Sequence, residues 1–133
     1  MFIFFQPNPL EKQELDKGKR ADCAIRCLCA ALDISWEEAY DVLCKYAKEV
    51  YEVPNGKIGF EYAIQKIGFE IKKLPRVQKG DTRMTVSKFS EVFPEKTAIM
   101  NCAGHYVCVK NGNIYDSWDS SDKAIYSYFE LKR

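Results

Sequence analysis

The segment from Asp22 to Leu32 constrains the fold more than any other part of the sequence. It is nearly all apolar, and Arg26 is its only internal charge. Asp22 is a good N-cap residue, so the segment predicts a helix that begins at Cys23. A helix that is apolar on most of its sides must be covered on most of its sides. We therefore expect it to lie buried at the centre of the fold.

The hydrophobic period changes from helical to extended in the second half of the chain. Residues 1–20 are interpreted as an extended, polar lead-in. Helices are predicted over 36–50, 58–67 and 86–93, the first and last capped by Ser35 and Thr85. A strand fragment and a basic loop are predicted over 69–83, and strands over 97–102, 105–110, 113–118 and 124–132. The prediction is an α+β fold with an N-terminal helical half and a C-terminal antiparallel β-sheet.

Length and composition indicate one ordinary domain over residues 1–133. A hydrophobic content of 47% in 133 residues can build one core. The net charge of +1 comes from 20 basic and 19 acidic residues, without a charge block of the kind that binds nucleic acid. No stretch approaches a membrane span, and the apolar N-terminal run is too short for a signal peptide. We therefore expect a cytoplasmic monomer that binds neither nucleic acid nor membrane.

Six cysteines offer candidate nucleophiles. In a cytoplasmic protein they are expected to be thiols, because disulfides are rare there and the apolar content makes them unnecessary. Cys23 stands out because unpaired N–H groups and the helix dipole lower the pKa of a thiol at a helix N-terminus. Its alternative role is that of a small buried residue, which is expected for the others. The others are Cys27, Cys29, Cys44, Cys102 and Cys108.

Asn111-Gly112 predicts a two-residue turn between two strands, with Lys110 opposite Asn113. Directly paired residues share a face of the sheet. Counting outward, the face expected to be buried carries His105, Val107, Val109, Ile114, Asp116 and Trp118.

His105, the only histidine, lies diagonally opposite Asp116 on that face, within side-chain reach. An unpaired buried carboxylate would be costly, so Asp116 should have a partner, and His105 is the nearest candidate. Asp119 falls on the other face. A purely structural interpretation makes His105 a core histidine and Asp116 a turn residue. The shared apolar face and a cysteine at a helix start favour a nucleophile site.

These residues resemble the papain-like cysteine peptidase superfamily, nearest to its small bacterial and phage members and the bacteriocin-leader peptidases. The resemblance rests on Asp22-Cys23 opening a buried helix, Gly104-His105-Tyr106-Val107 opening a strand, and Ile114-Tyr115-Asp116 on the next strand. It spans most of the chain and implies a single papain-like domain. It also implies that the helix cysteine attacks, the strand histidine is the base and the acid orients it.

The resemblance also concerns residues around this triad. A tryptophan often shields the histidine–acid pair in the family, and Trp118 fits that role. The family usually carries a glutamine roughly six residues before the cysteine as an oxyanion donor, and Lys17 stands there in this chain. Gln6, in the rigid Gln-Pro-Asn-Pro segment, is the preferred donor, together with the Cys23 backbone N–H. The Cys-Gly-x-Cys-Trp pattern of plant and lysosomal members is missing.

The sequence thus predicts a cysteine-dependent amide hydrolase, a peptidase or deamidase, that acts on a peptide or protein without a cofactor. One alternative is a catalytically inactive binding protein on the same fold, for example a phage-type interaction factor, which the missing glutamine favours. Another is a redox or metal module using Cys23 and Cys27. Structural zinc sites usually present Cys-x2-Cys loops, which are missing here, so no metal is expected.

Overall fold

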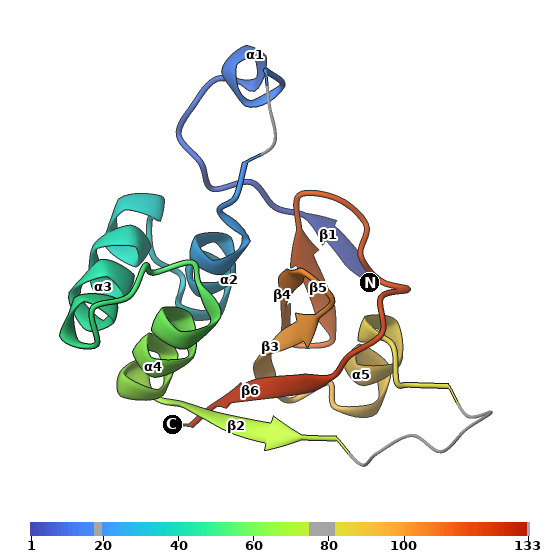
Figure 1. Ribbon diagram of the computed structural model, residues 1–133. Coiled ribbons are helices and arrows are strands. Elements are labelled where there is room, and N and C mark those ends of the chain that lie inside the picture. Colours follow the sequence, from blue (N-terminus) through green and yellow to red (C-terminus); the bar gives the residue numbers. More distant parts are fainter. Residues whose placement is uncertain (18–19, 75–81, 133) are drawn as a thin grey trace.

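One six-stranded sheet organises this computed structural model, which describes residues 1–17, 20–74 and 82–132 (Figure 1). Together with the five helices in these residues it makes an α+β structure. Most of the predicted basic loop, residues 75–81, lies outside the described part. The helices are α1 (Lys12–Leu15), α2 (Cys23–Leu32), α3 (Trp36–Glu49), α4 (Lys57–Ile67) and α5 (Val86–Val92). The strands are β1 (Phe2–Phe4), β2 (Phe69–Lys73), β3 (Thr97–Cys102), β4 (His105–Lys110), β5 (Asn113–Asp116) and β6 (Ser127–Leu131).

The sheet is mixed, with the strand order β1-β5-β4-β3-β6-β2. Its four C-terminal strands are antiparallel as predicted, and β2 joins them antiparallel to β6. The prediction of a purely antiparallel C-terminal sheet is wrong at the other edge, where β1 runs parallel to β5. The N-terminal segment is therefore more than an extended lead-in, since it contains β1 and the single turn α1. Both elements were missed because β1 has three residues and α1 has four, which is too few to show a hydrophobic period.

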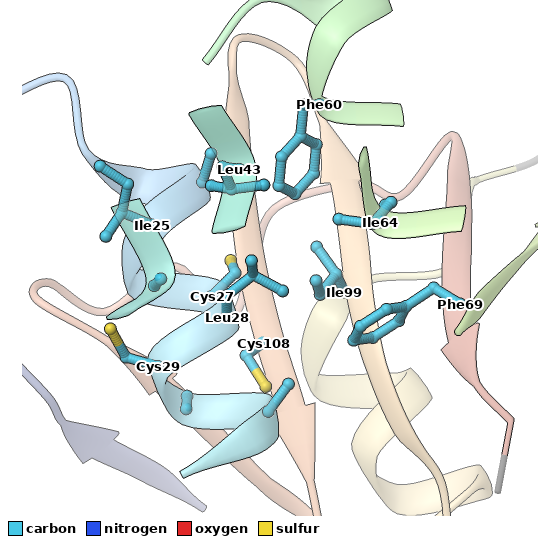
Figure 2. Packing of buried hydrophobic residues seen from close by; sticks show 14 of the residues in the cluster. Ile25, Cys27, Leu28, Cys29, Leu43, Phe60, Ile64, Phe69, Ile99 and Cys108 are labelled. Carbon is cyan, nitrogen blue, oxygen red and sulfur yellow. The ribbon is translucent and has the colours of Figure 1, made fainter. Parts of the chain in front are cut away.

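Helix α2 is buried, as predicted. All residues from Ala24 to Ala31 are buried. One side of α2 packs on β4 and β5, and α3 packs against another side (Figure 1). Figure 2 shows Leu28 of α2 among side chains from α3, α4 and the sheet. The apolar sequence of α2 thus places its first residue, Cys23, beside the sheet.

Local sequence signals set the ends of the other helices. The Ser35 hydroxyl accepts a hydrogen bond from the Glu38 N–H at 3.1 Å, and Thr85 caps α5 in the same way through the Lys88 N–H. Gly68 ends α4 with φ of 133°, a conformation that favours glycine. The observed ends of α3 and α5 each lie one residue before the predicted ones.

The β4–β5 hairpin has the predicted turn and register. Asn111 and Gly112 have φ of 54° and 75°, as a type I′ turn requires, and Lys110 pairs with Asn113. Strand β5 ends at Asp116, two residues earlier than predicted. The reason is that the Asp116 carboxylate accepts the Ser117 N–H at 2.8 Å, which turns the chain away from the ladder. Strand β6 likewise starts at residue 127 rather than 124.

Both faces of the hairpin are buried, whereas burial of only one face was predicted. Val107, Val109 and Ile114 pack under α5, in a core cluster that includes Phe89. On the opposite face Cys108 is fully buried in the cluster built around α2. No helix in the described residues is long and apolar enough to cross a membrane.

Phe60 tests the packing of α4 on the sheet. Its fully buried ring lies 4.4 Å from the Tyr106 ring and 6.3 Å from the Phe129 ring, between centroids. Phe60→Ala should lower the free energy of unfolding by about 3–5 kcal/mol in urea denaturation, because it leaves a cavity. Ile58→Ala, on the same helix but 62% exposed, should cost less than about 1 kcal/mol. Equal losses would contradict this packing.

Candidate active site

The fold brings the three predicted residues Cys23, His105 and Asp116 together. Cys23 is the first residue of α2, His105 the first of β4 and Asp116 the last of β5. The His105 Nε2 lies 2.7 Å from an Asp116 carboxylate oxygen, Oδ2. The Cys23 thiol hydrogen-bonds the same imidazole ring. Because Nε2 is engaged by Asp116, Nδ1 is the ring nitrogen left for the thiol.

The surroundings of Cys23 favour its thiolate. Burial raises the pKa of this thiol, but the hydrogen bonds from the His105 ring and the Tyr106 backbone outweigh that effect. The positive charges of His105 and Arg26 act in the same direction, so the pKa lies below its ordinary value. Cys23 is also half-buried rather than enclosed. It is therefore a thiol that can both ionise and meet a substrate.

His105 and Asp116 form an ion pair, and its carboxylate is buried behind the imidazole ring. Burial alone would lower the pKa of His105, yet the hydrogen bonds to Asp116 and Cys23 raise it to about 9. Burial raises the pKa of Asp116, and hydrogen bonds from His105 and Ser120 bring it below the ordinary value. The surroundings thus favour an imidazolium at His105, between the ionised Asp116 carboxylate and a thiol whose pKa is lowered.

In four other cysteines the pKa of the thiol is raised rather than lowered. Burial raises the pKa of Cys29 and Cys102 to about 11 and that of Cys108 to about 12. It also raises the pKa of the fully buried Cys27 well above its ordinary value. These thiols are small core residues, as predicted. All six cysteines are free thiols.

Asp116 is saturated with hydrogen bonds. Its Oδ2 accepts the Ser120 hydroxyl at 2.6 Å in addition to His105. Its Oδ1 accepts the Ser117 N–H at 2.8 Å and an Arg26 guanidinium N–H at 3.1 Å. The side chain of Asp116 is 1% exposed. This carboxylate therefore has one orientation, and so has the imidazole that it holds.

Arg26 connects Asp116 to a second buried carboxylate, Asp22. The other guanidinium nitrogen, Nη1, donates to the Asp22 Oδ1 at 2.9 Å. Asp22 Oδ2 accepts the Trp36 indole N–H at 3.1 Å and an Asn8 amide N–H at 3.2 Å. Asp22 does occupy the N-cap position of α2, but its side chain makes no capping hydrogen bond. The predicted capping role of this carboxylate is wrong, because the buried guanidinium takes it instead.

A cleft of about 1310 Å³ is lined by Cys23 and His105, and also by Gln6 and Trp118, which the resemblance had assigned to the site. The Trp118 ring lies over the His105 ring, with centroids 4.8 Å apart, and is 44% exposed on its other side. Gln6 lines the cleft with Cys23, and its amide oxygen accepts the Asn8 N–H at 3.2 Å. The bond uses the Gln6 oxygen as acceptor, so the NH₂ group is the part of this side chain that can donate.

Sequence reasoning missed three residues of the site, namely Asp22, Arg26 and Ser120. A signal existed for Arg26, since a lone charge in an apolar helix must find a buried partner. No local pattern connects Arg26 with Asp116, which lies 90 residues away. Ser120 follows Asp116 by four residues and lies just beyond the strand predicted over 113–118. The hairpin register therefore did not place it beside Asp116.

No family model, curated protein or solved structure matches the chain. Within the described residues, no three or more His, Cys, Asp or Glu side chains are grouped so as to hold a metal ion.

The Arg26 network should be a sensitive point for stability. Arg26→Met leaves the Asp22 and Asp116 carboxylates buried without their cation, so the free energy of unfolding should fall by about 3–5 kcal/mol in urea denaturation. Lys12→Met removes an equally short but exposed ion pair, Lys12–Asp16 at 2.6 Å, and should cost less than about 1 kcal/mol. A similar small loss for both variants would show that the buried network is not needed.

Proposed function

We propose that this protein is a papain-like cysteine amide hydrolase, with Cys23 as nucleophile, His105 as acid–base and Asp116 as the residue that orients it. One observation carries the proposal. The thiol whose pKa is lowered shares a hydrogen bond with the only histidine, both residues line a cleft, and the buried Asp116 carboxylate holds that histidine from behind. The buried helix that starts with the cysteine, packed on an antiparallel hairpin, supports a papain-like assignment of the fold.

In the acylation step the Cys23 thiolate attacks the carbonyl carbon of a peptide or side-chain amide and forms a C–S bond. The carbonyl oxygen becomes an oxyanion. His105, as imidazolium, then gives its proton to the amide nitrogen, and the C–N bond breaks to release the amine. A thioester and a neutral imidazole remain.

In the deacylation step water attacks the thioester while His105 takes up one of its protons. The C–S bond breaks, the acid product leaves, and the thiolate–imidazolium pair is restored. Asp116 stays ionised throughout and keeps Nε2 of the ring occupied, so that the other nitrogen faces the reacting atoms.

We assign the stabilisation of the oxyanion to two N–H groups. The backbone N–H of Cys23 belongs to the first turn of α2, which the Asp22 side chain does not cap. The Gln6 NH₂ group belongs to the same cleft, and its amide orientation is set by the Asn8 N–H. Such a pair of donors is what an acyl-transfer site requires. Gln6, in the segment that follows β1, would thus take the place of the usual glutamine near residue 17.

The first test is the pH dependence of Cys23 alkylation, which needs no substrate. Iodoacetamide should label Cys23 before the other five cysteines, with a midpoint below the pH at which ordinary thiols ionise. His105→Ala should move that midpoint upward, because the hydrogen bond and charge of the imidazolium are lost. Peptide mapping by mass spectrometry follows each thiol, and the buried Cys27 serves as internal control.

With a peptide library, hydrolysis should show a bell-shaped pH profile. Activity should fall on the acid side as the thiolate is protonated, and on the alkaline side near pH 9 as His105 loses the proton destined for the amine. Cys23→Ala should be inactive. Slow, non-selective labelling of Cys23 would overturn the proposal and favour a non-catalytic binding protein.

The orienting acid can be assigned by comparing Asp116 with Asp119. Asp119 is exposed and bonds only Ser121 nearby, so Asp119→Ala should leave activity within about twofold and stability within about 0.5 kcal/mol. Asp116→Ala should reduce kcat strongly and lower the free energy of unfolding by roughly 1–3 kcal/mol, because its buried donors lose their acceptor. Asp116→Asn, which keeps one acceptor oxygen, should retain part of the activity. The reverse ranking would assign the acid to Asp119.

A further inference from the structure

Positively charged side chains line the same cleft as Cys23. Lys57 is the first residue of α4, Arg20 lies shortly before α2, and Lys123 lies 5.7 Å from the centre of the Trp118 ring. Asp16 is the only acidic residue among the described residues that line the cleft. The wall thus differs from the chain as a whole, in which 20 basic and 19 acidic residues nearly balance.

The positive charge of this wall is not neutralised within the described part of the chain. Asp16 is already paired with Lys12, which also lines the cleft, at 2.6 Å. Arg26 is neutralised by its buried carboxylates. None of the described carboxylates forms an ion pair with Arg20, Lys57 or Lys123. An excess of cations therefore remains at the entrance to the triad.

Two helix N-termini add to this field. Cys23 at the start of α2 and Lys57 at the start of α4 both line the cleft. The N-cap residue of α4 is Gly56, which offers no side-chain acceptor, and the first turn of α4 carries no acidic residue. The partial positive charge of the α4 N-terminus is thus left to the cleft and its contents. Low-dielectric walls concentrate such a potential.

We propose that the cleft recognises an acidic peptide or protein segment, with Asp or Glu side chains near the amide that Cys23 attacks. This inference deepens the proposed function and rests on it for the position of the scissile bond. Lys57 and Lys123 line this cleft together with Cys23, so each can receive a carboxylate of the bound segment. A site that acts on a carbonyl carbon favours an acidic peptide over other polyanions.

The test compares an anionic and a neutral alkylating reagent at Cys23, at low ionic strength. The ratio of the iodoacetate rate to the iodoacetamide rate reports the local potential, because both reagents react with the same thiolate. Lys57→Gln and Lys123→Gln should each lower this ratio about twofold, as expected for a unit charge roughly 10 Å away in water, and the double variant about fourfold. Added salt should reduce the ratio of the unmodified protein.

Lys66→Gln is the matched control. Lys66 lies on α4 like Lys57 and changes the net charge equally, but it is exposed over Tyr62 and does not line the cleft. This variant should leave the ratio unchanged. An equal decrease of the ratio in all three variants would show that only the net charge of the protein matters, and would overturn the proposal.

Peptide protection identifies the ligand class. Hexaglutamate should slow iodoacetamide labelling of Cys23, and hexalysine should not. Protection by hexalysine, or stronger protection by an oligonucleotide of six uridines, would overturn the assignment to acidic peptides. The two proposals fail differently. An unreactive Cys23 would contradict the proposed hydrolase. A reactive Cys23 whose rate ratio does not change in the Lys57→Gln and Lys123→Gln variants would contradict only the acidic substrate.

Discussion

The buried carboxylate of Asp116 is the interaction on which the arrangement of this protein depends. It lies where β5 ends and receives hydrogen bonds from α2, from β4 and from the segment that follows β5. Because a buried carboxylate without donors would be costly, each of these elements is held to the position that supplies its donor. The same contacts end β5, turn the chain towards Trp118 and place the His105 ring. Structural and chemical requirements therefore meet in one side chain.

The protonation state of His105 follows from the charges around it. Arg26 lies between the two carboxylates of Asp22 and Asp116 and can neutralise only one of them. The remaining negative charge is balanced when His105 is an imidazolium, which is why its pKa reaches about 9 despite burial. The imidazolium in turn favours the Cys23 thiolate. The two carboxylates thus hold on His105 the proton that the proposed acyl transfer requires.

The sequence predicted those elements that are determined by residues close together in the chain. The Asn111-Gly112 turn fixed the hairpin register, and the apolar run of α2 predicted its burial. The register placed His105 and Asp116 on one face, where they do pair. The parallel pairing of β1 with β5 could not be predicted, because Phe2–Phe4 is too short for a period and its partner is more than 100 residues away. Burial of the second hairpin face was missed because it depends on α2 and Cys108 meeting in three dimensions.

In the site, too, the hairpin register predicted the local pair of His105 and Asp116, whereas the long-range contact of Arg26 with Asp116 was missed. That contact bears on how the site is held in place. A helix packed from apolar residues alone would be as stable or more stable than one that buries Arg26 between two carboxylates, since desolvation of such ions offsets most of their attraction. The guanidinium is 6% exposed and forms one ion pair through each of its terminal nitrogens. This fixes α2 in rotation and along its axis relative to β5. Cys23, three residues before Arg26 on the same rigid helix, is thereby set against the His105 ring. Precision of this kind is of little use to a core, and it supports the proposal that Cys23 and His105 act as nucleophile and base.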